Sequence, residues 1–260
     1  MDKATGEGTL TTRWGVADDG AMVHVSVPAT AAGRLDERWP PMGLTRGEEA
    51  GPSPDLVVVL RPGVAGTLLV EVDGEPTFGG WDRVESELAL FAAERLANLV
   101  AVHAAAVAIH DRVLLVPGPT GVGKSRLCIA AAEEGAVVLS DEYALVDAES
   151  GLVRGWQRAV RLRRPDGGVD RLNLARPTDP MPVGLVALVG FQPGGALAIE
   201  DLAPAKAALG LLANTVCAQS RPQESLDAAL RIARSCSAVG GTRGEATEAI
   251  RALMQRLGSQ

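Results

Sequence analysis

The stretch Gly118-Pro119-Thr120-Gly121-Val122-Gly123-Lys124-Ser125 decides how the chain is organised. Its spacing, G-x-x-x-x-G-K-S, is that of a phosphate-binding P-loop. The apolar run 112–117 before it predicts a buried strand, and residues 126–134 after it predict a helix that ends at Gly135. A strand, a glycine-rich loop and a helix in this order are the context in which the motif binds phosphate.

The residues of this loop suit a nucleotide. Glycines let the backbone fold around a phosphate and turn its N–H groups inward, and the helix N-terminus adds partial positive charge. We expect Lys124 to reach the β- and γ-phosphates and the Ser125 hydroxyl to bind Mg²⁺. The alternative is a glycine-rich turn that happens to precede Lys-Ser. The predicted nucleotide-binding residues are Gly118, Pro119, Thr120, Gly121, Val122, Gly123, Lys124, Ser125 and Arg126.

Length and composition limit the class of protein. The 260 residues suffice for one large domain or two small ones, and a hydrophobic content of 47% with 22% charged residues is ordinary for a globular protein. A net charge of −7 argues against a nucleic-acid binder or a protein that binds acidic membranes. The longest apolar run, 97–109, is too short to span a bilayer.

Three cysteines and the first residues bear on the compartment. Cys128, Cys217 and Cys236 are scattered and lack metal-ligand spacing, which favours buried thiols in a reducing compartment. Residues 1–7 contain no apolar signal region. The sequence therefore predicts a cytoplasmic protein without a membrane or nucleic-acid partner.

The order of the patterned segments predicts an α/β protein with two domains. Residues 1–80 form a small β-rich subdomain in this interpretation, and residues 81–260 form the P-loop core with helices near its C-terminal end. The expected strands of the subdomain are 9–16 and 22–28, joined by a turn at 18–20, and 56–60 and 67–72, which are expected to form a hairpin; a loop is expected over 29–54.

The core is expected to begin with a helix over 82–100. Next, a strand over 102–109 is expected to run antiparallel to the P-loop strand. The later expectations are a strand at 136–139, a hairpin over 143–155, a strand at 159–163, a mobile loop over 164–180, a hairpin of 184–191 with 196–200, and helices starting at 204, 222 and 244.

An acidic pair, Asp141-Glu142, ends the predicted strand after the P-loop helix. Ligands of α/β sheets bind at this end of the strands, so the carboxylates can face Ser125. One acid could bind Mg²⁺ while the other accepts a proton from a hydroxyl group. The alternative is a solvated acidic turn that closes the strand.

A histidine and an arginine cluster are further candidates. His103 lies in an apolar strand, where a histidine is usually a hydrogen-bonded core residue. Its strand leads to the P-loop strand, so we also consider a catalytic role. Arg161, Arg163 and Arg164 could neutralise phosphate charge or form a solvated strand edge.

Three stretches resemble the HPr kinase/phosphorylase family, whose core is like that of PEP carboxykinases. They are Val102 to Val107, the P-loop and Leu139 to Glu142, and the specific similarity covers about residues 100–165. In this family the acidic pair follows the P-loop lysine closely, whereas many other P-loop proteins carry the metal-binding acid much further on. The chain resembles a shorter, divergent member of the family.

The resemblance implies roles for individual residues. Lys124 and Ser125 would hold the ATP phosphates and Mg²⁺, Asp141 would act on the attacking hydroxyl, and Glu142 would be the metal-side acid, where the family usually has Asp. His103 would lie near the phosphates. The chain lacks the family's downstream Arg-Gly-x-Gly signature, so the resemblance does not identify HPr as the acceptor.

The sequence therefore predicts an ATP-dependent, Mg²⁺-dependent phosphotransferase with an HPr kinase-like core. It would move the γ-phosphoryl group to a hydroxyl, with a serine of a protein or peptide as the leading acceptor. Two alternatives stay open: a catalytically inactive nucleotide-binding sensor or scaffold, and a small-molecule kinase that acts, for example, on free serine. Because the related family tends to form hexamers, a homo-oligomer is also an expectation.

Overall fold

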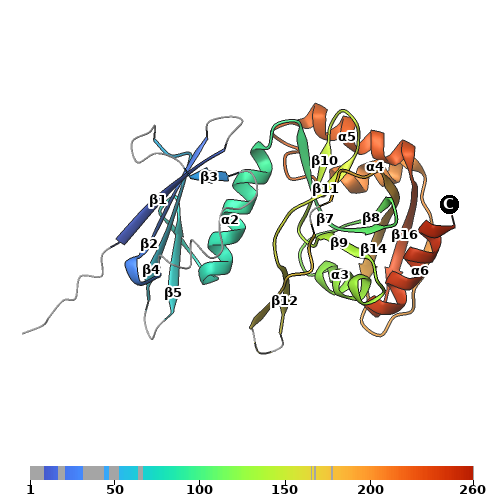
Figure 1. Ribbon diagram of the computed structural model, residues 1–260, viewed down its shortest axis with the longest axis horizontal. Helices are drawn as coiled ribbons and strands as arrows, with labels where there is room; N and C mark the ends of the chain where they lie inside the picture. The colour runs from blue at the N-terminus through green and yellow to red at the C-terminus, as the bar shows by residue number, and fades with distance from the viewer. Residues whose placement is uncertain are drawn as a thin grey trace, which may run out of the picture. The chain divides into compact units, whose positions relative to one another are not determined.

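The computed structural model (Figure 1) describes residues 9–16, 21–31, 44–46, 53–63, 67–164, 166, 168–176 and 178–259. Internal contacts divide the chain into two compact units, Met1–Ala97 and Asn98–Gln260. Helix α2 (Gly80–Arg95) groups with the first unit, although its residues were expected to open the core domain. The structure is of the mixed α/β class.

The first unit is a six-stranded sheet in the order β3-β1-β2-β4-β5-β6, on which α2 packs. The alternation of buried and half-buried residues in β2 shows why the segment folds as a strand with one face in a core. The strands are β1 (Thr9–Val16), β2 (Met22–Pro28), β3 (Leu44–Arg46), β4 (Leu56–Pro62), β5 (Leu68–Val72) and β6 (Glu75–Thr77), and a short 3-10 helix spans Ala29–Ala31.

Most of the predicted strands of this unit are confirmed, including the antiparallel pairing of β4 with β5. The expected loop over 29–54 was wrong at β3, which pairs with β1. The helix predicted to reach residue 100 ends at Arg95, because the backbone of Leu96 is already extended (ψ 117°). Asn98 follows in a left-handed conformation (φ 59°), and the next strand begins at Leu99. The turn expected at residues 18–20 lies outside the described residues.

The second unit is built on an eight-stranded sheet in the order β11-β10-β7-β8-β14-β16-β15, with β9 also paired to β7. Its strands are β7 (Leu99–Ile109), β8 (Arg112–Pro117), β9 (Val137–Ser140), β10 (Tyr143–Asp147), β11 (Val153–Gly155), β14 (Val183–Phe191), β15 (Ala198–Asp201) and β16 (Ser237–Arg243). As predicted, β7 and β8 are antiparallel and β10 pairs with β11.

Helices cover both faces of this sheet (Figure 1). Helices α3 (Lys124–Glu133) and α6 (Ala246–Gly258) bury apolar residues in one core cluster, and α4 (Pro204–Leu212) and α5 (Pro222–Ser235) bury theirs in a second cluster. Burial on both faces explains why β7 and β8 read as continuous apolar runs. No helix within the described ranges has the length and hydropathy needed to cross a membrane.

Two expectations for the second unit were wrong. Strands β14 and β15 do not form a hairpin, because β16 lies between them, parallel to β14 and antiparallel to β15. The loop expected over 164–180 contains β13 (Val169–Leu172), which forms a two-stranded sheet with β12 (Val160–Arg163). Strand β16 has the weak signal Ser-Ala-Val-Gly-Gly-Thr-Arg, since its two glycines interrupt the apolar pattern.

Candidate functional site

The ends of several strands meet at one edge of the second sheet. Strands β8, β14 and β16 are parallel, so their carboxyl ends lie at the same edge. In the antiparallel strand β7, Ala104 lies opposite Pro117, the last residue of β8. The backbone N–H of Ala104 also donates to the carbonyl of Glu142 at 3.1 Å, which brings the acidic pair to this edge.

The P-loop backbone follows the path that its glycines allow. Gly121 and Gly123 have φ values of 95° and 86°, in the left-handed region that other residues rarely adopt. The N–H of Gly118 donates to the carbonyl of His103 at 3.1 Å, which fixes the start of the loop on β7. Helix α3 begins directly at Lys124, so its unpaired N–H groups lie at the loop.

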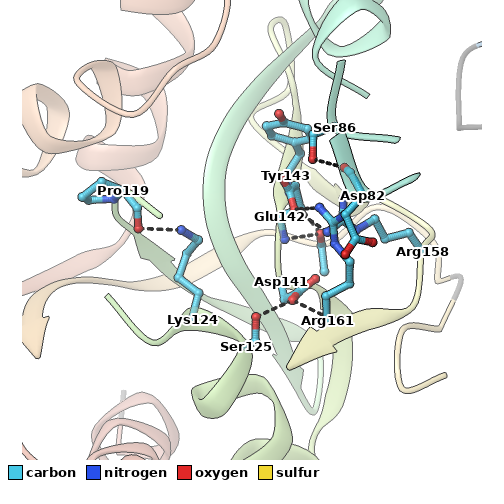
Figure 2. Close-up of polar contacts among 11 residues, drawn as sticks. Asp82, Ser86, Pro119, Lys124, Ser125, Asp141, Glu142, Tyr143, Arg158 and Arg161 are labelled. Atoms are coloured by element: carbon cyan, nitrogen blue, oxygen red, sulfur yellow. Dashed lines mark hydrogen bonds and ion pairs between the residues drawn. The ribbon is translucent and has the colours of Figure 1, made fainter. Parts of the chain in front are cut away.

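Lys124 lies within the loop and is buried. Its Nζ donates to the carbonyl oxygen of Gly118 at 2.7 Å and to that of Pro119 at 2.9 Å, the second of which Figure 2 shows. Burial lowers the pKa of this amine, while the nearby carboxylates of Glu142 and Asp141 act in the opposite direction. A phosphate entering the loop would replace these neutral carbonyls as the partner of the ammonium group.

Asp141 is brought to the P-loop as predicted. The Ser125 hydroxyl donates to Asp141 Oδ2 at 2.6 Å, and the backbone N–H of Arg161 donates to the same oxygen at 3.3 Å (Figure 2). Only 6% of Asp141 is exposed, and its Oδ1 is buried with no hydrogen-bond partner among the described residues. A buried carboxylate oxygen without a partner is costly, so it indicates that the site binds a ligand at this oxygen.

Ser140 fixes the turn that carries the acids. Its buried hydroxyl oxygen accepts hydrogen bonds from the backbone N–H groups of Glu142 and Tyr143, both at 3.1 Å. The turn therefore holds Asp141 in place through the backbone on both sides.

Glu142 is directed to arginines instead of to Ser125. Its Oε2 lies 2.6 Å from Arg158 and 3.7 Å from Arg161 (Figure 2). The structure thus brings Ser125 and Asp141 together but gives Glu142 a different set of partners from the one expected of a metal ligand. The spacing of adjacent acids could not reveal this, because Asp141 and Glu142 lie in a bend between β9 and β10, where no strand alternation fixes the direction of a side chain.

His103 lies near this group of charges as a neutral ring. Burial, helped by the positive charge of Lys124, lowers its pKa to about 4, although Asp141 acts in the opposite direction. The ring centroid is 5.9 Å from that of Tyr143, which in turn packs edge-on against Trp156 at 5.4 Å. At neutral pH His103 therefore brings no charge to a bound phosphate.

The remaining predicted residues are exposed. Pro119, Thr120 and Arg126 lie on the open side of the loop and the first turn of α3. Arg163 and Arg164 are exposed on the β12–β13 hairpin, where Arg164 pairs with Asp166 and Asp170, both at 3.2 Å. This pairing favours the interpretation of that part of the cluster as a solvated edge.

Arg243, at the end of β16, was not predicted. Its guanidinium donates to the carbonyl of Val122 in the P-loop at 2.7 Å and to that of Gly244 at 3.0 Å, and only 1% of the residue is exposed. A side chain at Gly123 would collide with it. Burial lowers the pKa of Arg243. No local pattern indicates this contact, because the strand that carries the arginine was itself not predicted.

The oxygen atoms of the site suit Mg²⁺ in part. The Ser125 hydroxyl and both Asp141 oxygens are hard donors of the kind that Mg²⁺ prefers. Within the described ranges no group of three or more His, Cys, Asp or Glu side chains could hold a metal ion. Two protein ligands suffice for Mg²⁺ in nucleotide sites, where phosphates and water complete the octahedron. No protein-family model and no curated protein matches the sequence.

Proposed function

We propose that the protein is an ATP-dependent phosphotransferase that moves the γ-phosphoryl group to a hydroxyl, with serine of a protein or peptide as the leading acceptor. The observation that carries this proposal is the buried Asp141 carboxylate, 2.6 Å from the P-loop hydroxyl of Ser125. A P-loop supports nucleotide binding, and an acid beside it supports transfer to a hydroxyl. The resemblance to the HPr kinase/phosphorylase family agrees with both parts.

The chain's own residues divide the reaction between them. Lys124 and the loop N–H groups bind the phosphate oxygens and stabilise the charge that develops on them. Asp141 accepts the proton of the acceptor hydroxyl through Oδ1, the oxygen without a partner in the described structure. The hydroxyl oxygen then forms a bond to the γ-phosphorus, and the bond to the β–γ bridging oxygen breaks, with ADP as the leaving group.

Ser125 and Asp141 Oδ2 would hold Mg²⁺. When bound, this ion neutralises charge on the β- and γ-phosphate oxygens. Glu142 has no place in this set, since its carboxylate pairs with Arg158. It acts instead as the counter-ion of the arginines beside the acidic turn.

A nucleotide-binding sensor without catalysis is the second candidate. It is favoured by the arginine partners of Glu142, which leave one acid where an active site of this kind usually has two. A kinase that acts on a small hydroxyl compound uses the same residues as the leading proposal and differs only in its acceptor.

An acceptor screen tests the proposal. Purified protein is incubated with Mg-ATP and either cell extract, a peptide library or free hydroxyl compounds, and phosphorylated products are identified by mass spectrometry. We expect a phosphorylated hydroxyl product with the wild type and none with Asp141→Asn. Asp111→Asn is the matched control, because Asp111 is an exposed acid in the turn between β7 and β8.

The products separate the candidates. A phosphopeptide supports protein phosphorylation, and a phosphorylated small molecule shifts the acceptor without changing the chemistry. If the protein binds ATP but transfers phosphate to no acceptor, the proposal is contradicted and the nucleotide-binding sensor is the remaining candidate.

A further inference from the structure

An exposed aromatic ring lies beside the P-loop on the side opposite Asp141. The second unit has three Phe, Tyr or Trp residues, of which Tyr143 and Trp156 are buried against each other. Phe191, the last residue of β14, is 43% exposed. A single exposed apolar side chain is common on protein surfaces, so the place of this ring beside Arg243 and the P-loop, and not its exposure, suggests a function.

Arg243 contacts both this ring and the P-loop. Phe191 and Arg243 are direct partners in the parallel register of β14 and β16, so their side chains lie on the same face of the sheet. The Arg243 guanidinium carbon lies 5.2 Å from the centre of the Phe191 ring, while a nitrogen of the same group donates to Val122 in the loop. A single side chain thus separates the ring from the phosphate-binding backbone.

The ring also continues a buried face. Ala187 and Val189 alternate with Phe191 along β14, and both lie in the core cluster under α3 and α6. Phe191 therefore lies on the α3 side of the sheet, beyond the point where the core ends. This is the side on which the P-loop enters its helix.

The order of the strands indicates toward which strands a bound nucleotide extends from the P-loop. Strand β8 has β7, with its neighbour β9 and the acidic turn, on one side, and β14 and β16 on the other. The phosphoryl group that is transferred must lie toward Asp141. The opposite end of the nucleotide, which carries the base, therefore extends toward β14 and β16, where Phe191 lies.

We infer that Phe191 is the platform on which the base of a nucleoside triphosphate stacks, and that Arg243 positions this platform against the P-loop. The inference rests on the nucleotide binding in the proposed function and adds the base to it. Stacking on a ring accepts any planar base, since every base has a π-face, and the larger purines bury more of the ring. The ligand class is a purine nucleoside triphosphate.

The test compares a ligand that has a base with one that lacks it. Dissociation constants of Mg-ATP and Mg-tripolyphosphate are measured by calorimetry for the wild type, Phe191→Ala and Phe191→Tyr. Leu209→Ala is the control, because Leu209 is a similarly exposed apolar residue on α4 (66%). We expect Phe191→Ala to weaken ATP binding by roughly tenfold, in the range of lost base–aromatic stacking, and to leave tripolyphosphate within about twofold. Phe191→Tyr keeps the ring and retains ATP binding.

Three results overturn the inference: unchanged ATP binding in Phe191→Ala, equal losses for ATP and tripolyphosphate, or equal affinity of the wild type for both ligands. In each case phosphate binding survives and the proposed function stands. A different result separates the two proposals in the other direction. If the protein binds ATP more tightly than tripolyphosphate but transfers phosphate to no acceptor, the proposed phosphotransfer is wrong and the role of Phe191 is supported. A wild type that binds neither ligand contradicts both.

Discussion

The two sides of the P-loop strand differ in the chemistry that they place beside the loop. On the β7 and β9 side lie the Asp141 carboxylate and the neutral ring of His103. On the β14 and β16 side lie the buried guanidinium of Arg243 and the exposed ring of Phe191. Acids suit the transfer of a phosphoryl group, whereas a cation and an aromatic ring suit the holding of a nucleotide. Substitutions on the two sides should therefore change different quantities.

The loop between the two sides should show the largest effect. Lys124→Met removes the ammonium group that both the ground state and the transition state need, so we expect transfer to fall by more than about a thousandfold and ATP binding by about tenfold or more. Transfer of radiolabelled phosphate and calorimetry measure these losses. Lys206→Met, which removes an exposed lysine on α4, should change neither. If Lys124→Met transfers phosphate at the wild-type rate, the P-loop does not take part in the reaction.

On the β7 and β9 side of the P-loop, His103 should make the stability of the fold depend on pH. The folded-state pKa is about 4, against an ordinary value of 6.5. Above pH 6.5 the ring is neutral in both states, and between 6.5 and 4 only the unfolded chain takes up the proton, so stability falls as the pH falls through this window. The loss amounts to about 3 kcal/mol and is complete near pH 4.

Urea unfolding of the wild type and His103→Gln at about pH 7.5 and about pH 4.5 measures this loss. The variant lacks the titrating ring, so the wild type should lose on the order of 2–3 kcal/mol more than the variant between the two conditions. Parallel pH dependence of the two proteins would show that His103 is not held neutral.

On the β14 and β16 side, Arg243→Met should weaken the binding of both ligands. It leaves the Val122 carbonyl without its donor, so tripolyphosphate should bind about tenfold more weakly, and it removes the cation that positions the Phe191 ring, so ATP should lose somewhat more than tripolyphosphate. This differs from Phe191→Ala, which should affect ATP alone. Arg243→Lys keeps the charge but cannot reach both carbonyls, so we expect an intermediate loss. Calorimetry with both ligands distinguishes the cases, and unchanged binding would contradict a positioning role.

Glu142→Gln should have the smallest effect. Because the Glu142 carboxylate pairs with Arg158, its loss breaks an ion pair that is partly open to solvent and should reduce transfer by less than about fivefold. Varying the Mg²⁺ concentration provides the check, since the half-saturating concentration should not move. A large increase in the half-saturating Mg²⁺ concentration would instead show that Glu142 is a ligand of the metal.

The sequence predicted the acid side of the site better than the binding side, for a physical reason. The P-loop, His103 and Asp141 lie within one stretch of about 40 residues with strong apolar strands, so local patterns place them. Arg243, by contrast, lies 121 residues after Val122, whose carbonyl it contacts. Its strand, β16, contains Gly240-Gly241, and these glycines weaken the apolar pattern by which a strand is predicted. Strand β16 also separates β14 from β15, which local reasoning paired as a hairpin.

Side-chain direction was the other missing information. The position of Glu142 in the sequence predicts an acid at the site, yet its carboxylate turns to Arg158, a residue on the approach to β12. Partners of this kind depend on long-range packing that no local pattern encodes. The same holds for β13, whose polar sequence favours a loop until the pairing with β12 is known.

The difference between the two sides is tested most directly by one paired measurement on Asp141→Asn and Phe191→Ala. For each variant, the single-turnover transfer rate at saturating ATP is measured together with the dissociation constant of ATP. The structure predicts opposite results for the two variants. Asp141→Asn loses transfer by about a thousandfold and keeps its ATP affinity within a few-fold, because the Asn side chain still offers an oxygen to Mg²⁺. Phe191→Ala loses affinity by roughly tenfold and keeps its rate at saturation. If both variants change the same quantity, the two sides of the P-loop strand do not divide chemistry from binding.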